Sequence, residues 1–142
     1  LAEFTQTGRT HASGEGGGGP AFEYFFEMME TLRRCDERGG FELRAHMGNL
    51  ALFQSGLFIE RIERRAARKG FPDVTYYEQI GESSFRMASR QRLATRLGLD
   101  ELLDRIADCF HRLRLALNSL ADRVFSWGEA DAQVAHMLVR GG

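Results

Sequence analysis

Glu42, His46 and Asn49 are residues of ligating type, and they lie four and three positions apart. On a helix this spacing places all three on one face. A histidine and a carboxylate one turn apart can bind a metal ion or share a proton. Asp108 and His111 lie three positions apart in the second half of the chain, and they could complete such a site between the helices of a bundle. These five residues form a candidate ligand-binding site.

The same residues also have a purely structural interpretation, which we favour. A single Glu-x-x-x-His pair is common by chance, so Glu42 and His46 can equally belong to a polar network or to a solvated helix edge. Di-iron bundles use two Glu-x-x-His motifs, and this sequence has none. Cys35 and Cys109 show no metal-binding spacing. We therefore predict no bound metal and no cofactor, and a small-ligand or metal site around Glu42, His46 and Asn49 is an alternative.

Arginines form a second candidate site, which could contact phosphate or nucleic acid. One group lies at the end of a predicted helix, and further arginines follow in the next predicted helix. If those helices are adjacent, the two groups could merge into a basic patch. The net charge of −1 and the lack of a nucleic-acid-binding motif argue against a nucleic-acid partner, so this function is an alternative. The arginines concerned are Arg61, Arg64, Arg65 and Arg68, then Arg86 and Arg90.

No sequence motif indicates catalysis. There is no G-x-S-x-G turn that would present a nucleophilic serine. The glycine-rich run at residues 14–19 is not followed by Lys-Ser or Lys-Thr, so it is not a phosphate-binding loop. The sequence therefore favours a protein without enzymatic activity.

Composition indicates a small globular protein. The 142 residues are 43% hydrophobic and 27% charged, which is ordinary for such proteins. The longest apolar stretch is shorter than a membrane span, and the two cysteines are typical of reduced thiols, so we expect a cytoplasmic location without membrane contact. We predict a remnant helix end and a flexible glycine-rich linker over residues 1–20, a helical domain over 21–128, and a short helix or frayed tail over 129–142.

Hydrophobic spacing predicts an all-α fold, a bundle of four to five helices. We expect helices over about 20–38, 41–69, 76–97 and 99–124. Gly39-Gly40 should end the first, and the second should be broken or kinked near Ser55-Gly56. Thr75-x-x-Glu78 predicts a capping box, and Asp100 should cap the last helix. That helix carries apolar residues in steps of four and three at Leu99, Leu103, Ile106, Phe110, Leu113, Leu117, Leu120 and Val124.

The segment from His46 to Phe58 should form the centre of this bundle, because its apolar residues point nearly all round a helix. Gly48, Ala51 and Ser55 place three small residues on one face, which would let a neighbouring helix approach closely. The glycine costs about 1 kcal/mol of helix propensity.

The stretch "HMGNLALFQSGLF…RIERR…PDVTYYEQIGESSFRMAS", within residues 46–89, resembles a motif of an uncharacterised bacterial protein family. It covers about a third of the chain, and the Leu-rich helix that follows fits it as well. The resemblance implies a bacterial, cytosolic helical domain and a natural protein that extends upstream of Leu1. It implies no activity, cofactor or site residue.

The leading functional hypothesis is a non-catalytic helical module for protein–protein contact or self-association. It depends on the long column of apolar residues in the last helix together with a linker of disordered composition. The expected partner is another protein or a second copy of the chain, as in a homodimer.

Overall fold

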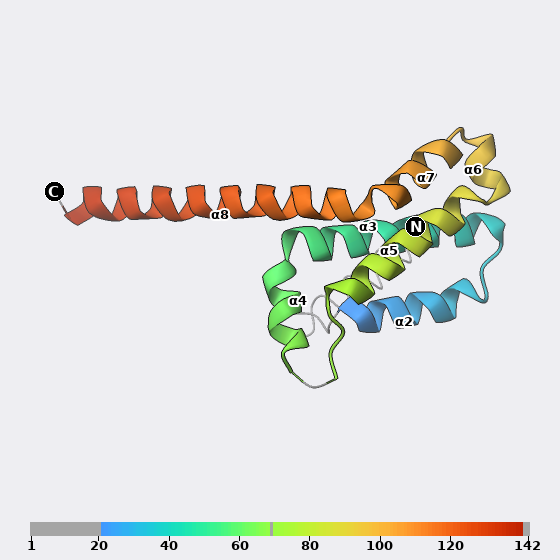
Figure 1. Cartoon of the computed structure of the whole chain (residues 1–142), viewed down its shortest axis with the longest axis horizontal. Helices are drawn as coiled ribbons and strands as arrows, with labels where there is room; N and C mark the ends of the chain where they lie inside the picture. Colours follow the sequence, from blue (N-terminus) through green and yellow to red (C-terminus); the bar gives the residue numbers. More distant parts are fainter. Residues whose placement is uncertain (1–20, 69, 141–142) are drawn as a thin grey trace.

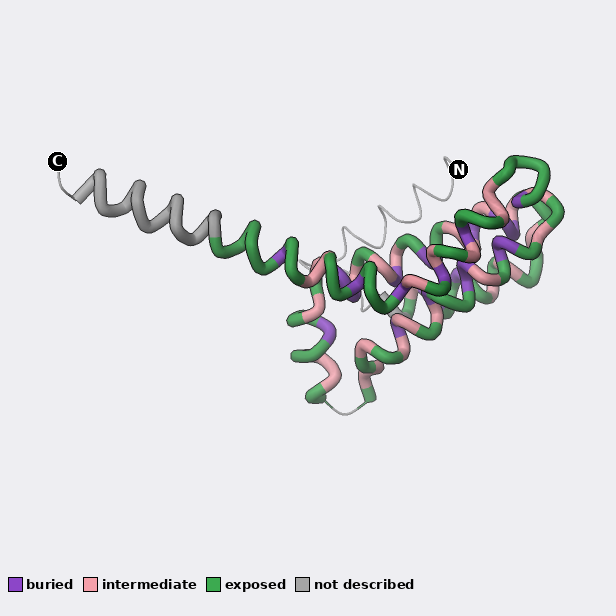
Figure 2. Tube along the Cα trace, turned by 45° about the horizontal axis from the view of Figure 1, so that its top comes forward, coloured by how far each residue is buried: buried purple, intermediate pink, exposed green. Residues whose placement is uncertain are grey.

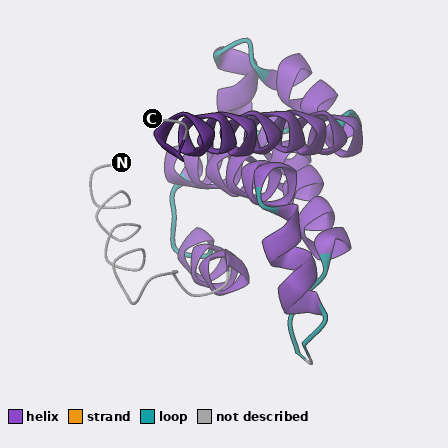
Figure 3. Cartoon of the chain, turned by 90° about the vertical axis from the view of Figure 1, so that its left-hand side faces the viewer, coloured by secondary structure: helices purple, strands orange, loops and turns teal. Residues whose placement is uncertain are grey.

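The computed structural model describes residues 21–68 and 70–140, and the side chains of residues 23–68 and 70–126. Within these ranges all regular structure is helical, which confirms the all-α prediction (Figures 1 and 3). The predicted linker over residues 1–20 lies outside the described residues. Seven helices are described: α2 (Ala21–Leu32), α3 (Glu37–Leu57), α4 (Ile59–Ala66), α5 (Val74–Ser89), α6 (Arg92–Arg96), α7 (Asp100–Asp108) and α8 (Phe110–Arg140).

The count exceeds the four or five helices expected because the predicted long helices are interrupted. The first break shows why Gly39-Gly40 is not a terminator: both glycines lie in the first turn of α3. Asp36 is the N-cap of α3, and its carboxylate accepts a hydrogen bond of 2.8 Å from the backbone N–H of Gly39. The cap starts a new helix where we expected the previous one to end.

The predicted kink near Ser55-Gly56 is confirmed, because α3 ends at Leu57 and α4 begins at Ile59. The hydroxyl of Ser55 donates a 2.6 Å hydrogen bond to the carbonyl of Ala51, a contact that tends to bend a helix. Phe58 between the two helices leaves helical geometry, with φ −123° and ψ 34°. In Figure 1, α4 accordingly turns sharply away from the line of α3.

The predicted helix over 76–97 is divided into α5 and α6, which are separated at Arg90 and Gln91. The N-cap of α5 is Asp73 rather than Thr75, since the Asp73 carboxylate accepts from the Tyr76 N–H at 3.3 Å. Gly98 follows α6 with φ +68°, a conformation that glycine adopts without strain, and so ends that segment as predicted.

Small residues let α3, α5 and α8 pack closely, as the Gly48, Ala51 and Ser55 face predicted. A Cβ atom on Gly48 would lie 2.7 Å from the Phe85 ring of α5. A Cβ atom on Gly56 would lie 2.6 Å from Leu117 of α8. Real Cβ atoms essentially never come within 3.0 Å of another heavy atom, so these glycines set the spacing of the helices.

Helix α3 is central to the fold on one of its faces only. It contacts α2, α4, α5, α6 and α8, and it contributes buried residues such as Met47 and Ala51 to the core. His46, Asn49 and Phe53 on its other face are exposed. The expectation that the segment from His46 to Phe58 is enclosed on all sides is therefore wrong for that face.

The predicted helix over 99–124 is broken at Cys109, which separates α7 from α8. Asp100 is the first residue of α7 and makes no side-chain cap. Beyond the break, α8 continues to Arg140, whereas we expected a helix that ends near residue 124 and a separate short helix or tail over 129–142. The break changes which face of the helix is buried, so part of the predicted apolar column of α8 is exposed to solvent.

Buried residues gather where α3, α5 and the first part of α8 lie together (Figure 2). In α8 the buried positions are Phe110, Arg114 and Ala121. After Phe125 the helix continues past the ends of α3 and α4 without another described helix beside it (Figure 1). Among the described residues, no helix is both long enough and apolar enough to cross a membrane.

Candidate functional site

The predicted ligand residues of α3 lie on its outer face. Glu42 accepts a hydrogen bond of 3.4 Å from Arg38 one turn earlier, and it lines a shallow hollow together with Phe41 and Leu93. His46 and Asn49 are exposed. Surrounding protein atoms partly desolvate the His46 ring, which lowers its pKa and favours the neutral imidazole.

Asp108 and His111 are engaged with α5 rather than with α3. A carboxylate oxygen of Asp108 lies 2.8 Å from a guanidinium nitrogen of Arg86, and Nδ1 of His111 lies 2.8 Å from Oε1 of Glu78. The contacts of these two residues therefore do not bring them to Glu42, His46 and Asn49. In the part of the chain that the structure describes, no three histidine, cysteine or acidic residues are grouped to hold a metal ion.

Arg86 does not add to a basic patch, because carboxylates surround it. Its guanidinium group lies 2.8 Å from both Asp104 and Asp108 of α7 and 3.4 Å from Glu82 of its own helix. The hydrogen bonds to Asp108 and Asp104 raise the pKa of Arg86. The charge of Arg86 is thus balanced locally, and this ion-pair cluster joins α5 to α7.

The arginines of α4 are different, because none of Arg61, Arg64, Arg65 and Arg68 forms an ion pair with another described residue. The guanidinium carbon of Arg61 lies 5.3 Å from the centre of the Phe58 ring, within the range of a cation–π interaction. Four positive charges on and just after one short helix are therefore available to a negatively charged partner.

A polar network between α5, α8 and the end of α3 was not predicted. Arg114 is buried, with 6% of its surface exposed, and its Nε donates to Oε1 of Glu78. Its Nη1 donates to Oδ1 of Asn118 at 2.8 Å. The Asn118 amide donates to the carbonyls of Ser55 and Gly56 at 2.9 and 2.6 Å. These carbonyls stand where α3 ends, so Asn118 stabilises the turn into α4.

The electrostatics of Glu78 depend on these contacts. Burial raises its pKa, but the hydrogen bonds from His111 and Arg114 outweigh burial, so the net pKa is lowered from the ordinary value of 4.5. Arg114 was missed because the spacing of apolar residues points away from it. In the sequence, Arg114 lies four positions after Phe110 and seven before Ala121, so helical spacing places the three residues on one face. This spacing is the signal that could have found it, since Phe110 and Ala121 are buried.

The break at Cys109 leaves an apolar surface exposed on α8. Leu113, Leu120 and Val124, three members of the predicted apolar column, are 36%, 52% and 52% exposed. Steps of seven and four residues put them on one side of the helix, and we call these three residues the α8 stripe.

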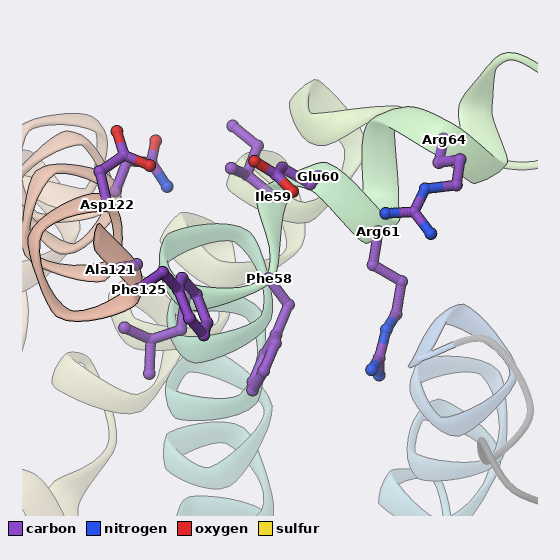
Figure 4. A pocket seen from close by; sticks show the side chains of 10 residues that line it. Phe58, Ile59, Glu60, Arg61, Arg64, Ala121, Asp122 and Phe125 are labelled. Carbon is purple, nitrogen blue, oxygen red and sulfur yellow. The ribbon is translucent and has the colours of Figure 1, made fainter. Parts of the chain in front are cut away.

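A groove lies on a different side of α8, in the corner between α4 and α8 (Figure 4). We call it the α4–α8 groove. Phe58 is 39% exposed and Phe125 is 61% exposed, and their rings flank the groove. Its lining includes Phe58, Ile59, Arg61, Arg64, Ala121 and Phe125.

Neither protein-family models, nor curated proteins, nor solved structures give a match to this chain. The resemblance of residues 46–89 to an uncharacterised bacterial family stays a prediction. The class of protein is therefore defined by its all-α fold and by two exposed apolar surfaces, the α8 stripe and the α4–α8 groove.

Proposed function

We propose that this chain is a non-catalytic helical module that self-associates, with α8 of one copy packed antiparallel against α8 of a second copy. The observation that carries the proposal is the α8 stripe. Leu120 and Val124 each expose half of their surface although they belong to a regular apolar column. Because about half of each side chain is already covered, burying the rest in an interface would stabilise it by roughly 0.8–1.5 kcal/mol each.

The outer part of α8 also supports a partner. The helix runs from Phe110 to Arg140, and residues 122–126, the last whose side chains the structure describes, are all exposed. An unsupported helix is only marginally stable in water, and most helical stability in proteins comes from packing of an apolar face. The sequence continues the spacing of the stripe with Trp127, Val134 and Leu138. A second helix along this column would stabilise both partners.

Charge favours an antiparallel second copy. Residues 110–125 of α8 carry three arginines and one aspartate, whereas residues 126–140 carry Glu129 and Asp131 against Arg140 alone, so the first half is net positive and the second half net negative. An antiparallel pair places the acidic part of one helix beside the basic part of the other, and a parallel pair places like charges together. Two-fold pairing of identical surfaces is also the commonest symmetry of homo-oligomers. The free cysteines Cys35 and Cys109 agree with a cytoplasmic setting for this module.

Light scattering coupled to size exclusion, over a range of protein concentrations, tests the proposal. We expect a dimer for the natural sequence and a monomer for the double variant Leu120→Glu, Val124→Glu. Leu115→Glu is the matched control, because Leu115 is 45% exposed on another side of the same helix, and this variant should remain dimeric. A natural chain that stays monomeric at high concentration contradicts self-association. Equal disruption by Leu115→Glu contradicts the assignment to the stripe.

A further inference from the structure

The α4–α8 groove is independent of the proposed dimer, because it lies on the side of α8 that faces α4. Helical periodicity separates its α8 residues, Ala121 and Phe125, from the α8 stripe. The groove has a volume of about 210 Å³. Pockets for drug-sized ligands are roughly 300–1,000 Å³, so the groove is suited to one large side chain of a protein partner.

The walls of the groove are apolar and aromatic. Figure 4 shows that the ring of Phe125 comes from α8 and the ring of Phe58 from the junction of α3 and α4, with Ala121 near Phe125; all three line the groove. An exposed aromatic pair around a small hollow is the kind of surface on which one anchoring side chain contributes most of the binding energy. The chemistry of the hollow itself therefore selects a large apolar residue.

The rim of the groove carries two arginines and one acid, Glu60, on its α4 side. Arg61 and Arg64 come from α4 and have no ion pair among the described residues, whereas Asp122 lies on the α8 side (Figure 4). Arg61 already stacks on Phe58, one of the aromatic walls. A carboxylate next to the anchoring side chain would meet the two guanidinium groups in bidentate geometry, which arginine favours.

We propose that the α4–α8 groove binds a short peptide segment of a partner protein, with one large apolar side chain between Phe58 and Phe125 and an acidic residue within one turn of it against Arg61 and Arg64. A nucleic acid is disfavoured because Glu60 and Asp122 also line the groove and would repel a continuous phosphate backbone. A second copy of the chain is disfavoured because the charge pattern and the apolar column of α8 direct self-pairing to the stripe.

Selection of displayed random peptides on the full chain, followed by fluorescence polarisation with one selected peptide, tests the proposal. We expect selected peptides to share an aromatic or large aliphatic residue with Asp or Glu within four positions. Phe125→Ala and Arg61→Glu should each weaken binding at least tenfold. Replacing the peptide's acidic residue by Lys should restore affinity for the Arg61→Glu protein. Phe125 is exposed, so its truncation leaves folding intact even if Phe58→Ala does not.

Two control variants separate this site from the dimer. Leu120→Glu with Val124→Glu should abolish self-association and leave peptide affinity unchanged, and Leu115→Ala should change neither. The proposal is overturned if no peptide is enriched, or if the enriched peptides bind Phe125→Ala as well as the natural chain. It is also overturned if a labelled 20-base oligonucleotide displaces the peptide. Conversion of the dimer to a monomer by Phe125→Ala would assign the groove to a second copy and overturn it as well.

Discussion

Replacement of Gly81 by alanine is expected to destabilise the protein, although alanine is the better helix former. Gly81 lies within α5, and a Cβ atom there would come closer than 3.0 Å to the Phe110 ring of α8 and to within 3.0 Å of the Ala51 Cβ atom of α3. Phe110 and Ala51 are 1% and 0% exposed, so neither can move outward into solvent. The added methyl group must therefore displace a ring or a helix backbone.

The magnitude follows from two opposing terms. Alanine gains about 1 kcal/mol of helix propensity over glycine. Inserting a methyl group into a filled core costs about 1–3 kcal/mol, and contacts with two helices at once place this site in the upper part of that range. The net loss should be about 1–2 kcal/mol. For a domain of this size, that corresponds to a fall in Tm of roughly 3–8 °C.

Gly40→Ala is the matched control, because Gly40 is also a buried helical glycine but has space for a methyl group. A Cβ atom added at Gly40 would lie 3.7 Å from its nearest neighbour, an ordinary van der Waals distance. This variant should be more stable than the natural chain by about 0.5–1 kcal/mol. Both variants are compared by urea unfolding at one fixed protein concentration, since dimerisation makes stability depend on concentration.

A rescue experiment identifies the cause. Phe110→Leu removes the ring that the new methyl group would meet, so the double variant Gly81→Ala, Phe110→Leu should lose less stability than the sum of the two single changes. The reasoning fails if Gly81→Ala is as stabilising as Gly40→Ala. It also fails if the two changes at Gly81 and Phe110 are simply additive.

Three further predictions concern the network of Glu78, Arg114 and Asn118. The pKa of Glu78 is lowered on folding, so its contribution to stability is present above pH 4.5 and is lost as the pH falls through the folded pKa. In acid titrations, the unfolding free energy of Glu78→Gln should therefore fall less steeply between about pH 5 and 3 than that of the natural chain. Arg114→Met should lower the unfolding free energy by about 1–3 kcal/mol at pH 7, because the Glu78 carboxylate loses a hydrogen-bond donor. Urea unfolding at pH 3.5 should show a smaller loss, and an equal loss at both pH values would assign the effect to packing alone. Asn118→Ala should cost about 1–2 kcal/mol, because it removes the amide group that donates to the carbonyls of Ser55 and Gly56. Amide hydrogen exchange should become faster in α4 than in α2, and unchanged exchange in α4 would contradict the role of Asn118 at this turn.

The helical class and the close packing of α3 were predictable because they depend on local spacing. Gly48, Ala51 and Ser55 form a small face wherever the segment is helical, and the kink follows from Ser55 and Gly56 in the same segment. Helix boundaries were less predictable, because competing caps decide them. Asp36 and Asp73 each accept from a backbone N–H and so start α3 and α5 earlier than glycine or Thr75 indicated.

The buried face of α8 could not be read from the sequence. Steps of four and three residues fit both the column through Leu113 and Leu120 and the buried set of Phe110, Arg114 and Ala121. The choice depends on the break at Cys109, with φ −98° and ψ 6°, and on Glu78, which supplies a partner for Arg114 from another helix. Long-range partners of this kind also explain why Asp108 and His111 face α5 instead of completing a site with Glu42 and His46.

The part of α8 beyond Ala121 gives the protein a fixed reach. Nineteen residues follow Ala121 up to and including Arg140, and at a rise of 1.5 Å per residue they extend for about 28 Å. A continuous helix fixes the distance and direction between its two ends, whereas a flexible linker with the same number of residues fixes neither. With a second copy packed along it, as proposed above, this part of α8 would hold whatever docks on its far end at a set distance and direction from the helical body.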